Sequence, residues 1–323
     1  MSDHFIKNIE IKNFKCFEDF KAEGFGRVNL IGGKNNVGKT AFMEACWVHA
    51  YGKSSDKMAV ALSTITTKRN ILEYFEKVMT KEDFQNNLEK NENFYAKSNL
   101  HLTIFHVKKE DSEKKYQFVF LNHNVNINTN KFNFDIKSSD IMYFISSFGL
   151  SNRALKRVYE AVQIQDREEE LYNLINKFDI NILNFKIIGG DKPQCKIKNG
   201  EYRDINEFGD GLKHYISIIC SLYAYKDGYL FIDELDNGIH YTQLDKLWEI
   251  ILTISKEQNV QVFATTHSKE AIESYARVAK RLKDEEITYT ILTKLEDNSI
   301  DAGVYSASML INTIDQEHEV RGW

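Results

Sequence analysis

The segment “GGKNNVGKTAF”, residues 32–42, constrains the fold of this chain more than any other stretch. The apolar run “RVNLI” precedes it and predicts a strand, and “AFMEACWVHAY” follows it with apolar residues at helical spacing. Gly33, Gly38, Lys39 and Thr40 match the pattern G-x-x-x-x-G-K-[ST] without a mismatch. A glycine-rich turn between a strand and a helix directs several backbone N–H groups toward one anion. The sequence therefore predicts a phosphate-binding loop here.

Composition narrows the class of protein. The chain has 323 residues, of which 42% are hydrophobic and 28% charged, as in globular proteins of one large domain or two ordinary ones. The net charge of −5 gives no overall field that attracts nucleic acid, so a nucleic-acid partner would need a local basic patch. The start of the chain lacks the apolar core of a signal peptide, and no apolar run reaches the length of a membrane span. We therefore expect no membrane partner. The four cysteines form no C-x-x-C pair, so we expect free thiols, as in a cytoplasmic protein.

The first half of the chain mixes strand and helix patterns. “FIKNIEIKNF” predicts an opening strand that a turn joins directly to “RVNLI”, and the pattern from residue 51 to about residue 98 is helical. “LHLTIFHV” and “YQFVFLN” predict a hairpin around the charged turn “KKEDSEKK”. A strand in “IMYFISS”, helices over 151–178, and strands in “ILNFKII” and “PQCKIKNGEYRDI” are expected to follow. The long pattern “ILEYFEKVMTKEDFQNNLEK” is typical of an amphipathic surface helix.

The second half alternates helices with strands. Helices are predicted in “GLKHYISIICSLYAY”, “TQLDKLWEIILTISKE” and “KEAIESYARVAKRLK”, and strands in “GYLFIDE”, “VQVFATTH” and “TYTILTKLE”. Strands that are almost continuously apolar and alternate with helices indicate a parallel sheet covered on both faces. After “VQVFATTH” we expect one helix, one strand and a tail.

Polar residues stand at the ends of two of these strands. Asp233 and Glu234 follow the apolar run “YLFI”, where Asp233 can hold Mg²⁺ and Glu234 can polarise a water for attack on a γ-phosphate. An acidic pair alone is as typical of an ordinary acidic turn after a strand as it is of a catalytic site. The phosphate-binding loop in the same chain favours a nucleotide site. His267 ends the next strand and can donate a hydrogen bond to a phosphate oxygen, although a lone histidine there is more often structural.

Two glycine-containing turns lie close to the acidic pair in the sequence. “NEFGDGLKHYISI” places Gly209 and Gly211 before a long helix, and glycine-flanked helix starts bind anions. A second anion site is needed only if a dimer shares its nucleotides between subunits. “LDNGIH” is most simply an ordinary turn after a strand.

Taken together, the motifs resemble the ABC-type ATPase heads of the branch that includes the SMC, RecF and OLD-family proteins. The resemblance runs through “IEIKNFKCFEDF”, “NLIGGKNNVGKT”, “FGDGLKH”, “LFIDELDNGIH” and “ATTHS”, and so covers nearly the whole chain. It implies an α/β fold with a parallel core sheet flanked by helices and an antiparallel β portion in the N-terminal lobe. We expect one domain over 1–323: an N-terminal β lobe with the phosphate loop (1–50 and 99–150), a helical insertion (51–98), a helical segment (151–180) and a C-terminal lobe (181–323).

The resemblance also implies a role for individual residues toward ATP and Mg²⁺. Lys39 would contact the β- and γ-phosphates and Asn35 the γ-phosphate, Thr40 and Asp233 would hold Mg²⁺, and Glu234 would be the catalytic base. His267 would sense the γ-phosphate, and it would be a catalytic residue together with Glu234 and Lys39. The turn at Gly209 and Gly211 would close on the nucleotide of a partner subunit. Where many relatives have a serine in that turn, this chain has Gly209. The expected nucleotide-binding loop comprises Gly33, Lys34, Asn35, Asn36, Val37, Gly38, Lys39, Thr40 and Ala41.

The function that the resemblance implies is ATP hydrolysis by a head that forms a homodimer or higher homo-oligomer around ATP. No heptad run separates Thr40 from Asp233, which argues against a coiled-coil arm, and the segment after His267 is too short for a nuclease domain. We therefore expect a separate effector protein, in prokaryotic antiphage defence or DNA maintenance. The alternative is a nucleotide-dependent sensor or scaffold with little turnover. A small-molecule kinase would need neither “FGDGLKH” nor “ATTHS”.

Overall fold

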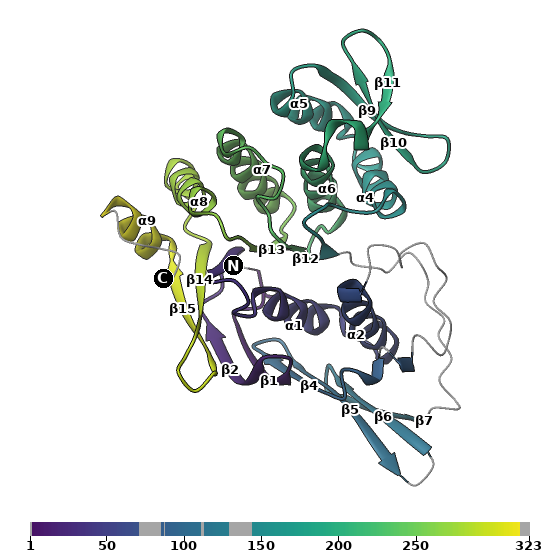
Figure 1. The fold of residues 1–323 in the computed structure, drawn as a ribbon, viewed down its shortest axis with the longest axis vertical. Coiled ribbons are helices and arrows are strands. Elements are labelled where there is room, and N and C mark those ends of the chain that lie inside the picture. Colours follow the sequence, from purple (N-terminus) through teal and green to yellow (C-terminus); the bar gives the residue numbers. More distant parts are fainter. Residues whose placement is uncertain (1, 71–84, 87, 111–112, 129–143, 317–323) are drawn as a thin grey trace.

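The computed structural model describes residues 2–70, 85–86, 88–110, 113–128 and 144–316. At its centre lies a sheet with the strand order β15-β14-β3-β13-β12-β8 (Figure 1). All neighbouring strands are parallel except β15, which pairs antiparallel with β14 at one edge. The predicted parallel core sheet is confirmed. Its strands are β3 (Val28–Gly33), β8 (Phe144–Ile145), β12 (Tyr229–Ile232), β13 (Gln261–Thr265), β14 (Ile287–Lys294) and β15 (Ile300–Ser306).

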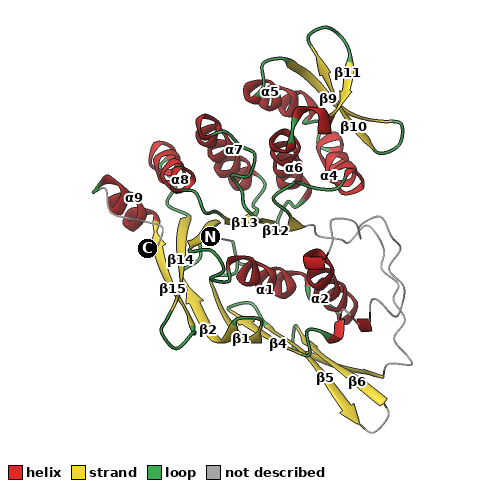
Figure 2. Cartoon of the chain, in the orientation of Figure 1, coloured by secondary structure: helices red, strands yellow, loops and turns green. Residues whose placement is uncertain are grey.

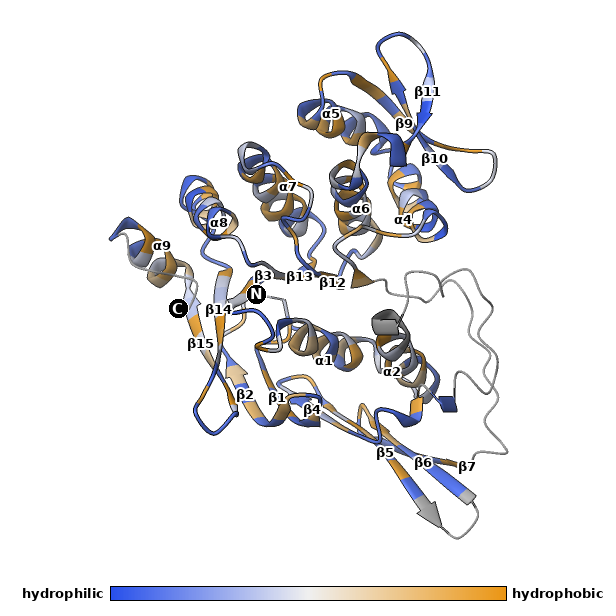
Figure 3. Cartoon of the chain, in the orientation of Figure 1, coloured by the Kyte–Doolittle hydropathy of each residue, from blue (hydrophilic) through white to orange (hydrophobic). Residues whose placement is uncertain are grey.

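Both faces of this sheet are covered, as the apolar strands predict. Helices α6 (Asp210–Ala224), α7 (Leu244–Glu257) and α8 (Lys269–Leu282) lie on one face, and α1 (Lys39–Tyr51) lies on the other (Figure 1). Successive residues of a strand point to opposite faces, so Leu230 and Ile232 belong to the core under α6–α8, whereas Tyr229 and Phe231 belong to the core around α1. Figure 3 shows apolar residues along these strands and on the helices beside them.

An antiparallel sheet forms the N-terminal lobe, with the order β2-β1-β4-β5-β6-β7. Phe17 and Phe20 of β2, Ile11 of β1, and Phe42 of α1 are buried in one core, which joins this sheet to the α1 face of the central sheet. The predicted hairpin is β5–β6, which extends from the body of the molecule (Figure 2). The strands are β1 (Asn8–Phe14), β2 (Phe17–Glu23), β4 (Asn93–Ser98), β5 (Leu102–Glu110), β6 (Glu113–Phe120) and β7 (His123–Asn128).

Three of these strands, β2, β4 and β7, were not predicted. The polar segment 123–128 forms β7 because it pairs antiparallel with β6. The polar segment “FEDFKAE” forms β2 because it pairs antiparallel with β1. Residues 93–98, predicted as the end of a helical region, form β4, in which Phe94 and Ala96 are buried between β1 and β5. The helix expected after residue 51 is present as α2 (Ser55–Asn70). The pattern “ILEYFEKVMTKEDFQNNLEK” and the start of “IMYFISS” lie largely outside the described residues.

The segment between β8 and α6 agrees with the expected helices and strands. It comprises α4 (Asn152–Ile164), α5 (Glu168–Phe178), a small antiparallel sheet in the order β11-β10-β9, and a 3-10 turn, η4 (Ile205–Phe208), that leads into α6. The three strands are β9 (Ile182–Ile188), β10 (Lys192–Ile197) and β11 (Tyr202–Asp204).

More structure follows His267 than the sequence pattern predicts. Beyond the expected helix α8 and strand β14, the chain forms β15 and then α9 (Ala307–Asp315). The expectation of one helix, one strand and a tail is therefore wrong. The polar strand β15 forms because it pairs antiparallel with β14 over residues 288–294 and 300–306.

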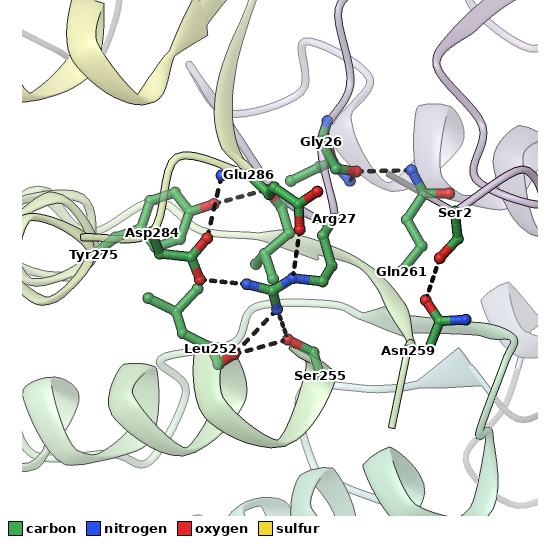
Figure 4. Close-up of polar contacts among 12 residues, drawn as sticks. Ser2, Gly26, Arg27, Leu252, Ser255, Asn259, Gln261, Tyr275, Asp284 and Glu286 are labelled. Atoms are coloured by element: carbon green, nitrogen blue, oxygen red, sulfur yellow. Dashed lines mark hydrogen bonds and ion pairs between the residues drawn. The ribbon is translucent and has the colours of Figure 1, made fainter. Parts of the chain in front are cut away.

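A buried polar cluster fixes the amino-terminal end of β3 (Figure 4). Arg27 is 2% exposed and forms an ion pair with Asp284, which precedes β14. Its guanidinium also donates to the Ser255 hydroxyl and, over 3.0 Å, to the Leu252 carbonyl of α7. The Tyr275 hydroxyl of α8 donates to the carbonyl of Val28 over 2.8 Å. One arginine thus joins the start of β3 to α7 and to the segment between α8 and β14.

Candidate functional site

The loop between β3 and α1 has the conformation that its glycines allow. Gly33 and Gly38 adopt φ values of 130° and 104°, which residues with a Cβ rarely adopt. A Cβ on Gly38 would lie 2.6 Å from the Cys16 sulfur, and a Cβ on Gly33 would overlap the Leu292 carbonyl. Helix α1 begins after Gly38, and no side chain caps its first-turn N–H groups. The loop and helix start therefore match the geometry of an anion site.

Lys39 reaches back across this loop. Its ammonium donates to the carbonyl oxygens of Gly33 and Lys34, each over 2.8 Å. Burial lowers the pKa of Lys39 to about 8, an effect that the nearby carboxylates of Asp233 and Glu234 partly offset. A polyphosphate beside Lys39 would supply negative charge that favours its protonated form.

The other predicted loop residues divide into two groups. Lys34, Asn35 and Asn36 are exposed at the tip of the loop, whereas Val37 and Ala41 are buried in the core around α1. The side chains of Val37 and Ala41 therefore pack against the protein, and only their backbone groups remain for a nucleotide.

Thr40 and Asp233 meet where β3 and β12 end. The Thr40 hydroxyl lies 3.3 Å from each carboxylate oxygen of Asp233, and the Asp233 amide donates to the Ile145 carbonyl over 2.8 Å. Hydroxyl and carboxylate oxygens are hard ligands of the kind that Mg²⁺ prefers. Within the described residues, no group of three or more His, Cys, Asp or Glu side chains could hold a metal. This pair therefore fits an ion that takes its remaining ligands from water and phosphate.

Glu234 and His267 lie next to this pair and are half-exposed. His267 Nε2 is 3.8 Å from Glu234 Oε1. Burial and the positive charge of Lys39 lower the pKa of His267, although the carboxylates around it act in the opposite direction. The neutral imidazole is therefore favoured. Asp233, Glu234 and His267, which are far from Lys39 in sequence, thus gather beside it at the carboxyl ends of the parallel strands.

Gly209 and Gly211 differ in their surroundings. Gly209 is exposed with φ 82° and ψ 166°, and no heavy atom lies within 4 Å of the position that a Cβ would take. Gly211 is buried, and a Cβ there would overlap the backbone of Gly238 in the turn after the acidic pair. Within the described residues, no hydrogen bond joins either glycine to the phosphate-binding loop. Of these two glycines, Gly209 is the one that presents a bare backbone to solvent.

Sequence reasoning missed Thr265 and His214. Thr265, the last residue of β13, hydrogen-bonds to the acidic pair, and His214 Nε2 donates to the Leu235 carbonyl over 3.1 Å. Thr265 could have been noticed because a polar residue ends a buried strand two positions before His267. His214 carries no such signal, since it occurs within an apolar helical pattern.

His214 leads to a pH prediction. Burial lowers the pKa of His214 to about 4, so below pH 6.5 the unfolded chain binds a proton at this site that the folded chain does not. We expect this one histidine to reduce the free energy of unfolding by about 1.5 kcal/mol between pH 6.5 and 5. His214→Gln keeps an N–H donor for Leu235. It should lose this part of the pH dependence of the free energy of unfolding, measured by urea unfolding at both pH values. The same change at the exposed His240 is the control, and an unchanged pH dependence in His214→Gln would contradict the assignment.

Comparison with known proteins gives one family match. Residues 28–273 match the family described as “AAA domain, putative AbiEii toxin, Type IV TA system”. This range begins with β3 and ends within α8, so it includes the phosphate-binding loop, the acidic pair and His267.

A curated protein and solved structures are similar over nearly the whole chain. An ATP/GTP phosphatase of Helicobacter pylori is 26% identical, over 98% of this chain and 100% of that protein. An SMC head bound to the C-terminal winged-helix domain of ScpA has a TM-score of 0.53 and 12% identity, covering 94% of this chain and 98% of that one. An SMC head of Pyrococcus furiosus with an extended coiled coil, bound to the C-terminal domain of ScpA, gives 0.51 and 10%, covering 97% and 99%. At these identities the structures show the fold alone. Among the described helices, none is long and apolar enough to cross a membrane.

Proposed function

Because the chain belongs to this AAA-domain family and is an ATP-hydrolysing P-loop enzyme with the fold of an SMC-type ABC head, we propose that it forms a homodimer around ATP and controls a partner effector. The observation that carries this proposal is the meeting of Lys39, Thr40, Asp233, Glu234 and His267 at one edge of the central sheet. A phosphate-binding loop, an acidic pair and a histidine together form a site suited to cleavage of a terminal phosphate.

Each side chain has a distinct task in this proposal. The backbone of residues 33–41 and the Lys39 ammonium hold the phosphates, and Asn35 extends from the exposed tip of the loop toward the γ-phosphate. Glu234 accepts the proton of the attacking water, and its half-exposed carboxylate is open to solvent water. His267, favoured in its neutral form, donates a hydrogen bond to the γ-phosphate and so detects whether that phosphate is present.

Thr40 and Asp233 would hold Mg²⁺, because their three oxygen atoms already lie together. The ion, when bound, neutralises charge on the β- and γ-phosphates.

The exposed turn at Gly209 supports completion of the site by a second subunit. A residue with a φ of 82° and a ψ of 166° is almost always glycine, and here no neighbouring side chain requires the absence of a Cβ. We propose that the turn is kept bare so that its N–H groups and the start of α6 can approach the γ-phosphate held by a partner copy. Gly211 has a different part, since its small size lets α6 pack against Gly238 within the chain.

The partner effector is proposed from two comparisons. The family description refers to a toxin of a toxin–antitoxin system, and SMC heads have been solved with a bound domain of ScpA. We propose that ATP-dependent closure of the dimer changes the surface that an effector recognises, in antiphage defence or DNA maintenance, and that the protein acts in the cytoplasm.

A mixing experiment tests the shared site. Gly209→Ala should leave ATP binding through the chain's own loop unchanged but reduce hydrolysis at least tenfold, since it adds a side chain and backbone strain at the proposed trans contact. Mixed with Glu234→Gln after verified subunit exchange, it should regain activity. In a mixed dimer one site carries both changes and the other carries neither.

The control is Gly190→Ala. Gly190 also has a positive φ, 97°, and open space around it, but it lies in the β9–β10 turn. The Gly190→Ala variant should show any loss of stability that alanine causes at a positive φ, while its rate of ATP hydrolysis stays unchanged. If the two inactive variants exchange subunits and regain nothing, the site is completed within one chain and the shared-site proposal is wrong.

A further inference from the structure

Thr265 connects the two acidic residues of the site through a single hydroxyl group. It is the last residue of β13, next to β12, and its side chain is buried. Its Oγ1 donates to Asp233 Oδ1 over 2.7 Å and accepts the N–H of Glu234 over 2.8 Å. The Thr265 carbonyl also accepts the N–H of Leu235 over 2.9 Å. Three consecutive residues of the acidic segment are therefore bonded to one residue of the neighbouring strand.

The bond to Glu234 stabilises an unusual backbone conformation. Glu234 has a φ of 48°, in the left-handed region that residues with a side chain seldom occupy. Such a conformation persists where neighbouring groups hold it. The conformation at Glu234 turns the chain sharply at the end of β12, which sets the direction of its side chain relative to His267.

The bond to Asp233 fixes the carboxylate that lies beside Thr40. Asp233 Oδ1 accepts from Thr265 over 2.7 Å and is 3.3 Å from the Thr40 hydroxyl, so Thr265 selects one carboxylate orientation. The next residue acts similarly further along, because the Thr266 hydroxyl donates to Asp236 Oδ1 over 2.6 Å. The end of β13 and the residue after it thus hold the acidic segment at two points.

We propose that Thr265 is a positioning residue for ATP hydrolysis, which orients the Asp233 carboxylate for Mg²⁺ and the Glu234 backbone for the attacking water. The inference rests on the roles of Asp233 and Glu234 in the proposed function. The Thr265 hydroxyl must donate to Asp233 and accept from Glu234 at the same time, so its hydrogen has a single orientation. Serine keeps this double function, whereas valine keeps the shape of threonine and loses both bonds.

The test compares Thr265→Val with Thr265→Ser. We expect Thr265→Val to lower kcat by about 10–100-fold and to raise the Mg²⁺ concentration needed for half-maximal binding of a fluorescent ATP analogue by a similar factor. Binding of the analogue without Mg²⁺ should be unchanged. Thr265→Ser should retain kcat and the Mg²⁺ requirement within about threefold, since it keeps both hydrogen bonds.

Thr290→Val is the matched control for removal of a buried hydroxyl. Thr290 is buried in β14 of the same sheet, and its hydroxyl has no hydrogen-bond partner among the described residues. The Thr290→Val variant should therefore hydrolyse ATP at the same rate as the unchanged protein. If Thr265→Val does not fold, Thr265→Ala replaces it, because its smaller side chain cannot clash with the surrounding core.

Two results would overturn the inference. One is hydrolysis and Mg²⁺ dependence in Thr265→Val equal to those of Thr290→Val. The other is a loss in Thr265→Ser as large as that in Thr265→Val, which would show that the effect does not depend on whether the hydroxyl is present. Failure of the proposed function is separable: Glu234→Gln would then remain active, whereas failure of this inference alone leaves Glu234→Gln inactive and Thr265→Val active.

Discussion

Glu234→Gln is expected to slow ATP hydrolysis by about 10²–10⁴-fold, the range that a positioned general base contributes. The amide keeps the size of the side chain and its place 3.8 Å from His267 but cannot accept the proton of the attacking water. Lys39, Thr40 and Asp233 are untouched, so ATP affinity should change by less than about threefold. Phosphate release measures the first quantity and isothermal titration calorimetry the second. Size-exclusion chromatography with ATP should show an accumulated dimer.

Glu249→Gln is the control for this substitution. Glu249 is exposed on α7, where it pairs with Arg281 over 2.7 Å. In the part of the chain that the structure describes, no hydrogen bond or ion pair joins it to the site. It should hydrolyse ATP at the unchanged rate. Wild-type turnover in Glu234→Gln would mean that another group accepts the proton and that the acidic pair is wrongly assigned.

Arg27→Met is expected to lower the free energy of unfolding by about 3–5 kcal/mol, the usual cost of leaving one member of a buried ion pair alone. Arg27 is 2% exposed, and the substitution would leave the Asp284 carboxylate buried without its cation and the Leu252 carbonyl without this donor. Urea unfolding followed by circular dichroism measures the change. Adding Asp284→Asn should recover part of the loss, because the double variant no longer buries a lone charge.

Arg281→Met tests whether burial is the cause. Arg281 forms an exposed ion pair with Glu249, and such pairs contribute about 1 kcal/mol or less. Equal destabilisation by Arg27→Met and Arg281→Met would show that the buried cluster contributes no more than a surface pair.

The sequence predicts the parts of the fold that depend on local pattern. Continuous apolar runs identify β12 and β13, which are completely buried, and the polar residues after them, Glu234 and His267, meet as expected for parallel strands. Strands β2 and β15 carry many charged or polar residues and no clear apolar alternation. They form because a neighbouring strand supplies their hydrogen bonds, which no local pattern encodes.

The candidate site shows the same division. The loop from Gly33 to Thr40 is recognisable because each residue type has a local reason, such as a positive φ or a charge. The double hydrogen bond of Thr265 and the packing of Gly211 on Gly238 depend on contacts between different elements. Gly209 and Gly211 therefore look equivalent in the sequence, although one is exposed and the other is buried.

The position of β3 has a consequence for synthesis of the chain on the ribosome. Strand β3, residues 28–33, is among the first parts to be translated, but its neighbours in the sheet are residues 262–265 and 287–292. Its apolar residues and both of its edges thus stay unpaired until almost all of the chain has emerged. Pairing between such distant segments is slow, and exposed strand edges promote aggregation. We therefore expect the central sheet to form only near the end of translation, with the nascent chain a natural client for chaperones until β14 emerges.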